Sequence, residues 1–208
     1  MWNNVTIRES WLHNTASFGG DTTARQVIRL SRRYISGKVL DVGAGSGALL
    51  DLLPYAFGVD IVPRHKQCQQ GSIDSLPFDD NSFSTVFCTD VLEHLPSEVL
   101  ARGMREVCRV LLHGGHLILT IPNNERLEES NVYCPACGAE FHRWGHVQTF
   151  TRASITKRLN DNGFKVITVR ALPLGLMAEH FLIRYCWKWF IRVGFCKASD
   201  LFVVGEKV

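Results

Sequence analysis

The chain has 208 residues, of which 46% are hydrophobic, and a formal net charge of +3 at pH 7. This mild charge excludes a strong electrostatic drive toward nucleic acid, although it leaves local basic patches open. No stretch has the pattern of a secretory signal or of a charge-free membrane span, so we expect a cytoplasmic protein. The length and the apolar content suit one compact α/β domain over residues 1–208.

The sequence of the N-terminal part predicts a segment that packs on the rest of the domain, followed by a helix. Trp2 and Trp11 stand among polar residues and favour a leader that docks on the body of the domain, with a simple packed arm as the alternative. A helix is expected from Thr22 or Thr23 to about Ile35. Its arginines favour a solvated face, with contact to an anionic substrate or RNA as the alternative.

The stretch from Lys38 to Asp51 is expected to turn a buried strand into a helix. Val39–Val42 is the strand, and glycines follow at alternate positions. Glycine lets the backbone turn sharply and leaves nothing beyond Cα in the way of a ligand, while Ser46 is placed to cap the helix. A strand that runs through such a turn into a helix N-terminus is typical of nucleotide-binding cradles. A tight turn without a ligand has the same pattern.

Two carboxylates flank this turn and indicate which ligand it holds. Asp41 lies on the strand just before the glycines, where it would repel a phosphate and attract a cationic group such as an amine or a sulfonium. A second strand, Ala56–Asp60, ends in Asp60, at the position where doubly wound folds grip a ribose diol.

The rest of the chain predicts alternating helices and strands. The strand over 83–89 ends just before Asp90, Glu93 and His94, which we expect at the rim of the site because ligands of open α/β sheets lie outside the carboxyl ends of strands. The other expected elements are helices over 63–70, 96–112 (stopped by Gly114 and Gly115) and 151–162, and strands over 116–122, 164–171 and 200–206.

Four ordered motifs resemble the class I S-adenosylmethionine-dependent methyltransferases, with motifs closest to ubiquinone-type O-methyltransferases. They are Val39–Gly47, Gly58–Asp60, Leu76–Phe83 and Asp90–Leu95. The resemblance implies a doubly wound, Rossmann-like sheet of seven strands with helices on both faces and a last antiparallel strand. It divides the domain into an N-terminal cap and helix (1–35), a cofactor-binding core (36–170) with an insertion (130–147), an aromatic helical insertion (171–199) and the last strand (200–208).

The resemblance implies S-adenosylmethionine as the cofactor, often enclosed by the N-terminal segment. Adenine recognition departs from the family, whose acid is replaced by Ser72, so that Ser72, Asp74 or the backbone near Ile73 are alternatives. The implied cofactor-binding residues are Asp41, Gly43, Ala44, Gly45, Gly47, Asp60, Ile61, Ser72, Ile73, Asp74 and Thr89.

Glu93 and His94 are the candidate catalytic residues. Methyl transfer displaces an activated, neutral leaving group, so the protein mainly aligns the reactants and removes a proton where the acceptor carries one. A histidine suits that role, and the Leu-Glu-His-Leu run resembles that of ubiquinone-type enzymes. In the competing interpretation, His94 only begins a helix or bonds to a loop.

Asp90, Glu93, His94 and the distant His146 supply two carboxylates and two imidazoles, a ligand set that suits a divalent cation. The set resembles that of small-RNA 3′-terminal 2′-O-methyltransferases, which have Glu in place of Asp90. The alternative function is therefore a metal-dependent RNA 2′-O-methyltransferase. The low net charge, without a basic groove carrying interleaved aromatic residues, argues against it.

Cys134 and Cys137 are the one closely spaced pair among seven cysteines, and the others are expected to be reduced and mostly packed. Their spacing is that of a zinc knuckle, and His142 and His146 follow closely enough to complete four ligands. Such a zinc would order the insertion over the active site. A reduced pair in a loop is the alternative, and His146 can serve only one of the two metals.

Residues 178–194 predict an aromatic, apolar helix with a basic stripe of His180, Arg184, Lys188 and Arg192. Such a face can pack into the fold or a dimer, cover a hydrophobic substrate, or make peripheral contact with a membrane surface. The leading function is therefore methyl transfer to a small, hydrophobic acceptor, lipid or quinone-like, at oxygen. A non-catalytic S-adenosylmethionine-binding module is the remaining alternative.

Overall fold

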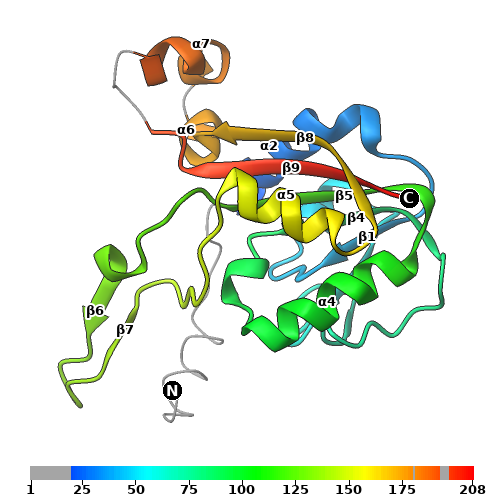
Figure 1. Ribbon diagram of the computed structural model, residues 1–208, viewed down its shortest axis with the longest axis horizontal. Coiled ribbons are helices and arrows are strands. Elements are labelled where there is room, and N and C mark those ends of the chain that lie inside the picture. The colour runs from blue at the N-terminus through cyan, green and yellow to red at the C-terminus, as the bar shows by residue number, and fades with distance from the viewer. Residues whose placement is uncertain (1–19, 180, 193–196) are drawn as a thin grey trace.

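The computed structural model describes residues 20–179, 181–192 and 197–208 (Figure 1). Its main sheet has seven strands in the order β3-β2-β1-β4-β5-β9-β8. The last strand, β9, is antiparallel to both of its neighbours, whereas the strands from β3 to β5 pair in parallel. The predicted fold class is confirmed. The strands are β1 Val39–Val42, β2 Phe57–Asp60, β3 Cys68–Gln70, β4 Phe83–Thr89, β5 Leu111–Pro122, β8 Phe164–Leu172 and β9 Asp200–Lys207.

Helices cover both faces of this sheet (Figure 1). On one face lie α4 (Ser97–Val110) and α5 (Arg152–Asn160), and on the other lie α2 (Gly20–Ser31), α3 (Ala48–Leu52) and α6 (Leu174–Glu179). The remaining helices are η1 Arg32–Tyr34, η2 Leu92–His94, η3 Leu127–Ser130 and α7 Phe181–Arg192.

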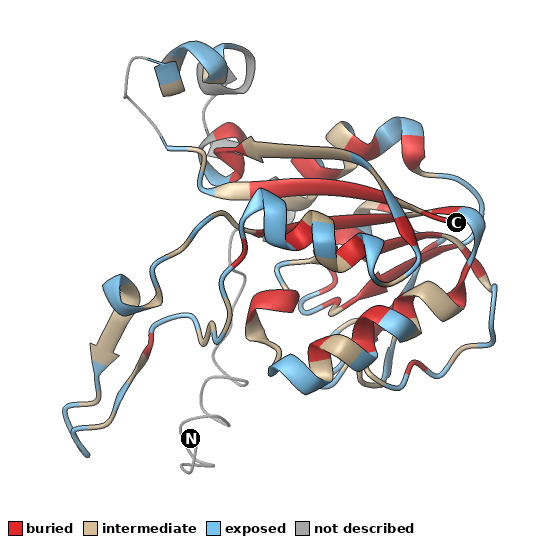
Figure 2. Cartoon of the chain, in the orientation of Figure 1, coloured by how far each residue is buried: buried red, intermediate tan, exposed pale blue. Residues whose placement is uncertain are grey.

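The core follows the period of two that strands impose, since successive side chains point to opposite faces. In β5, Leu117 and Leu119 join the core under α4 and α5, whereas Ile118 joins the core under α2, α3 and α6. The central strands β1, β4 and β9 are accordingly buried along most of their length, whereas β3 and most of β8 are partly buried or exposed (Figure 2). This burial on both faces fixes the register of the central strands, and with it the positions of the loops at their carboxyl ends.

We expect Ile118→Val to lower the free energy of unfolding by about 1 kcal/mol, because it removes a methylene from a fully packed site. The matched control is Ile167→Val on β8, where the side chain is 38% exposed and the same change is expected to stay within about 0.5 kcal/mol. Urea denaturation of both variants measures the difference. Equal losses would contradict this assignment of the core.

The predicted helix over 63–70 is wrong. Residues 68–70 form β3, which pairs in parallel with β2 from Gly58↔Cys68 onward. The side-chain amide of Gln67 also donates to the carbonyl oxygens of Pro54, at 2.7 Å, and Ala56, at 3.1 Å. The open edge of β2 thus gives this short polar segment hydrogen-bond partners that an isolated helix turn lacks.

Two predicted helix boundaries also need correction. Helix α3 begins after Gly47, which adopts a left-handed φ of 87°, and Ser46 does not cap it. Helix α4 ends at Val110 without the glycine pair, because Leu111 already pairs with Phe83 of β4. By contrast, Thr151 caps α5 as predicted, in a reciprocal capping box with Ser154.

Two further segments flank the sheet. The insertion carries a separate two-stranded hairpin, β6 (Asn131–Tyr133) with β7 (Glu140–His142), that extends away from the main sheet in Figure 1. In the aromatic insertion, Trp187 of α7 packs against the core under α2, and Trp189 is 60% exposed. Among the described residues, no helix combines the length and the apolarity that crossing a membrane requires. The predicted docking of Trp2 and Trp11, and His180 of the basic stripe, lie outside the described residues.

Candidate functional site

A cavity of about 660 Å³ opens at the carboxyl ends of β1, β2 and β4. It lies where the strand order reverses between β1 and β4, the usual binding position in doubly wound sheets. The structure brings most of the predicted residues into its wall, together with His94. Those cofactor residues are Asp41, Gly43, Ala44, Gly45, Asp60, Ile61, Ser72, Ile73 and Thr89.

The glycine turn forms the floor of this cavity. The backbone N–H of Gly43 donates to the carbonyl oxygen of Val59 at 2.8 Å, which ties the turn to β2. A Cβ on Gly43 would lie 2.4 Å from a methyl group of Val91, whereas a Cβ on Gly45 would lie 3.9 Å from its nearest neighbour, the carbonyl oxygen of Gly43. Packing therefore excludes a side chain at Gly43 but not at Gly45. The space at Gly45 faces the cavity and lets a ligand approach the backbone.

Asp41 is a buried carboxylate without a partner. It is 2% exposed, and its Oδ1 accepts no hydrogen bond. Burial, and then repulsion from Asp60, raises the pKa of Asp41 to about 7. A buried carboxyl group without a partner at the wall of a cavity favours binding of a cationic ligand. Such a ligand would stabilise the ionised carboxylate and supply the hydrogen-bond donor that its oxygen lacks.

Asp60 closes the opposite side of the turn. Its Oδ2 accepts the backbone N–H of Gly45 at 2.8 Å, and its Oδ1 accepts that of Val62 at 2.8 Å. Each carboxylate oxygen can accept a further hydrogen bond. Asp60 therefore holds the turn in shape and still presents acceptors to a ligand hydroxyl.

His94 stands on the cavity wall, with Glu93 behind it. Burial, and then the neighbouring His146, lowers the pKa of His94 to about 4, so that its ring is neutral near pH 7. Glu93 is 1% exposed, its Oε2 has no hydrogen-bond partner, and burial followed by repulsion from Asp90 raises its pKa well above the usual range. The Glu93 carboxyl is therefore harder to ionise than an exposed glutamate.

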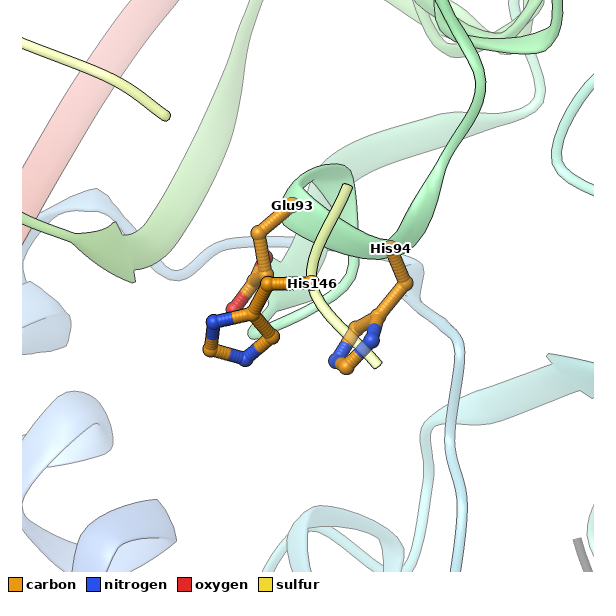
Figure 3. Close-up of side chains that lie close together, drawn as sticks. All are labelled: Glu93, His94 and His146. Atoms are coloured by element: carbon orange, nitrogen blue, oxygen red, sulfur yellow. The ribbon is translucent and has the colours of Figure 1, made fainter. Parts of the chain in front are cut away.

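Glu93, His94 and His146 meet at one point (Figure 3). Glu93 and His94 come from η2 and His146 from the segment after β7, and one ligand atom from each lies within 4.8 Å of the others. The rings of His94 and His146 pack edge to face with centroids 4.8 Å apart. The fold thus brings His146 to the Glu-His pair across about fifty residues of chain, whereas Asp90, the fourth residue of the predicted ligand set, is not part of this cluster.

A family model for the methyltransferase domain matches residues 15–169, which is most of the chain. The chain belongs to this methyltransferase family. Its strand order, with the last strand antiparallel, is the fold of S-adenosylmethionine-dependent methyltransferases, and S-adenosylmethionine is its cofactor. The resemblance of the four motifs is thereby confirmed.

Other known proteins resemble this methyltransferase more distantly. It is 26% identical over 163 residues to protein MJ0638 of Methanocaldococcus jannaschii, a match that covers 73% of this chain and 66% of that protein. It is 24% identical over 216 residues to demethylmenaquinone methyltransferase of Bacteroides fragilis, with coverage of 85% and 87%. Burkholderia thailandensis 1,6-didemethyltoxoflavin-N1-methyltransferase has the same fold, with a TM-score of 0.67 at 12% identity and coverage of 97% and 85%.

The side chains in the wall of the methyltransferase cavity have the charges and hydrogen-bonding groups that S-adenosylmethionine requires. The unpartnered Asp41 carboxylate suits the ammonium or sulfonium charge, and Asp60 suits the ribose diol. Two expected cofactor residues lie outside the wall. Gly47 packs instead, since a Cβ there would lie 2.6 Å from His65, and Asp74 pairs with Arg102 at 2.7 Å.

Of the residues expected to hydrogen-bond the adenine, the structure places only some at the cavity. Ser72 and Ile73 line the cavity, whereas Asp74 does not. The hydroxyl of Ser72 donates to Oδ1 of Asp74 at 2.5 Å. The hydrogen bond to Asp74 fixes the hydroxyl proton of Ser72, which leaves the oxygen lone pairs to accept a donor such as an amino group.

The predicted zinc site does not form as one cluster. In the described part of the chain, no three of Cys134, Cys137, His142 and His146 bring ligand atoms within 4.8 Å of one another. The cysteines occupy the turn at the tip of the β6–β7 hairpin, whereas His142 lies at its other end, paired with Asn131. The hairpin holds the cysteine pair away from the histidine pair although all four residues are close in sequence. The two histidines cluster with Glu125 instead.

The sequence alone does not indicate two features of the site. Thr23, Ala24 and Val27 of α2 line the cavity, although only the amphipathic pattern of that helix is visible in the sequence. Glu125 approaches His142 and His146 from the loop after β5. In the sequence, nothing distinguishes Glu125 from the other acidic residues, because its contacts with the two histidines form only when the chain folds.

Proposed function

We propose that this methyltransferase transfers the methyl group of S-adenosylmethionine to a hydroxyl oxygen of a small, hydrophobic acceptor, with His94 accepting the proton. The observation that carries the proposal is the position of His94 in the wall of the cofactor cavity, where burial lowers the pKa of the ring to about 4 and leaves a nitrogen lone pair that can accept a proton. S-adenosylmethionine supplies an activated methyl on a sulfonium, so the chain needs no covalent intermediate. Its residues hold the cofactor, align the acceptor and remove one proton.

The geometry of His94 suits this proton transfer. Its Nδ1 lies 3.4 Å from the carbonyl oxygen of Gly145, which accepts a proton donor. A neutral ring that donates through Nδ1 carries its lone pair on Nε2. Nε2 is then the atom that takes the proton from an acceptor hydroxyl as the carbon–oxygen bond forms.

The lining of the cavity supports a small and largely apolar acceptor. Next to the polar groups that hold the cofactor, the wall consists mostly of aliphatic side chains, among them Val27, Ile61, Val62, Val91, Leu95 and Val147. Ligand sites with few polar groups in an apolar wall select hydrophobic molecules with one oriented polar atom. The similarity to a demethylmenaquinone methyltransferase is consistent with a quinol-like acceptor.

A transfer assay tests the proposal. The purified chain is incubated with methyl-labelled S-adenosylmethionine and separate panels of phenols and quinols, hydroxylated lipids, and short RNAs. We expect label in a methyl ether of a small phenol or quinol. Label in RNA alone would overturn the proposal. No label in any panel, with S-adenosylhomocysteine still bound in calorimetry, would replace it with a non-catalytic binding module.

A metal-dependent RNA 2′-O-methyltransferase is the second candidate, because one carboxylate and two imidazoles converge at Glu93, His94 and His146. Such a set suits a divalent transition metal. The fourth predicted ligand, Asp90, is directed elsewhere, since its Oδ1 accepts the hydroxyl of Thr120 at 2.9 Å. Loss of transfer to RNA on chelation, with recovery on adding Mn²⁺, would favour this candidate. Transfer that survives chelation rejects it.

A further inference from the structure

The turn between β6 and β7 contains two cysteines in a backbone held by its own hydrogen bonds. The N–H of Cys134 donates to the carbonyl oxygen of Ala139 at 2.9 Å, and the carbonyl oxygen of Cys134 accepts the N–H of Gly138 at 2.8 Å. Gly138 has a left-handed φ of 70°, which a glycine adopts without strain. The chain thus closes into a tight turn that includes both Cys134 and Cys137.

Hydrogen bonds within this turn orient the sulfur of Cys134. The sulfur accepts hydrogen bonds from the backbone of Cys137 and of Ala136, and it also contacts the side chain of Cys137. Both cysteines are free thiols. Hydrogen bonds that orient a ligand atom are typical of metal sites, and two cysteines at this spacing commonly bind one zinc ion. The turn therefore presents two sulfurs that a single ion can contact.

One chain supplies only half of a zinc site through this turn. Structural zinc is bound by four ligands in a tetrahedron, and thiolates select zinc over magnesium or calcium. Among the residues that the structure describes, no cluster of three histidine, cysteine or acidic side chains includes Cys134 or Cys137. His142 pairs with Asn131 at the opposite end of the hairpin, where the strand ladder holds it. Two further ligands are required from another source.

The position of the turn makes a second copy of the chain a suitable source. The hairpin extends away from the main sheet, with the turn at its far end (Figure 1). Cys137 is exposed, and a Cβ on Gly138 would meet no described atom within 4 Å. Tyr133, directly before the turn, is 71% exposed and offers apolar surface that a second hairpin can cover. Two such turns can therefore meet while the main sheets stay apart.

We propose that two copies of the chain share one zinc ion, bound by Cys134 and Cys137 of each copy. Two-fold symmetry presents the same surface of both copies to each other, so that two sulfurs from each give the four ligands of a closed site. The two tips alone form a small contact, well below the area of a stable interface, so the dimer depends on the ion. Neither cysteine lines the cofactor cavity, and the proposal is independent of the methyl acceptor.

The ratio of zinc to chain is the direct test. The full chain is kept reduced, dialysed against buffered Zn²⁺ and measured by elemental analysis and analytical ultracentrifugation. We expect one zinc ion for each pair of chains, and a dimer that a chelator separates into monomers. Co²⁺ in place of zinc should give the thiolate-to-metal absorption of four thiolates. Any other ratio of zinc to chain, or a dimer that survives chelation, would overturn the proposal.

Cysteine variants test which thiols bind the ion. Cys134→Ser and Cys137→Ser each remove two of the four ligands from the dimer, and we expect both variants to lose the zinc and to be monomers. Cys186→Ser, at another exposed cysteine, is the matched control and should keep both the zinc and the dimer. Retention of zinc and dimer in Cys134→Ser would contradict the proposal. The zinc content of the wild-type chain decides the question even where a variant fails to fold.

Discussion

Replacing His94 with alanine is expected to lower kcat for transfer to a hydroxyl acceptor by about 10²- to 10⁴-fold, the usual contribution of a positioned general base. The affinity for S-adenosylhomocysteine should change only a few-fold, because the groups suited to hold the cofactor, Asp41 and Asp60, are untouched. Steady-state kinetics and calorimetry measure the two quantities separately. A loss in kcat with intact binding would mark a residue that acts on the reaction itself.

The pH dependence gives an independent check on His94. The ring can take a proton only while it is neutral, and its pKa of about 4 makes it neutral above that value. Activity should therefore rise as the pH increases through about 4 and be flat with respect to this group near pH 7. His113→Ala, at an exposed position of β5, is the control and should keep full activity. Wild-type kcat in His94→Ala would reject the base.

The sequence predicts the sheet well because its signals are local. The strand at Val39–Val42, the glycine turn and the acid at Asp60 depend on nearest neighbours and on spacing along the chain, and the cavity forms where they meet. The helix predicted over 63–70 does not form, because polar residues such as those of this segment suit an edge strand as well as a solvated helix face. The edge of β2, which settles the choice, is contributed by a different part of the chain.

The insertion shows the opposite case, because there the fold overrides sequence spacing. Cys134 and His142 are near in sequence, but an antiparallel hairpin places the turn and the strand end apart. His94 and His146 are far apart in sequence and come into contact, and Glu125 contacts His146 from a third segment. Spacing alone identifies ligands within one turn, whereas clusters built from several loops depend on tertiary packing.

The cost of burying Asp41 leads to a prediction about stability. Its pKa rises from 3.8 to about 7, so the folded chain binds more protons than the unfolded chain between these values. Stability is therefore lost as the pH rises from about 4 to 7, by about 4 kcal/mol in all. Asp41→Asn removes this charge but leaves a buried amide that costs about 1–3 kcal/mol. We expect the cofactor-free variant to be more stable than wild type at pH 8, by about 1–3 kcal/mol, with a smaller difference at pH 5.

The same substitution is expected to impair binding, because the charge that weakens the fold is the one that meets a cationic ligand. Loss of one partner of a buried charge pair costs about 2–5 kcal/mol, so the affinity for S-adenosylmethionine should fall by about 30-fold or more. Urea denaturation at pH 5 and pH 8 and calorimetry test the two effects, with Asp161→Asn on the exposed surface as the control. A variant that gains stability and loses binding would show that the chain keeps an unfavourable carboxylate for its ligand. A variant that binds normally would contradict the assignment of Asp41 to the cation.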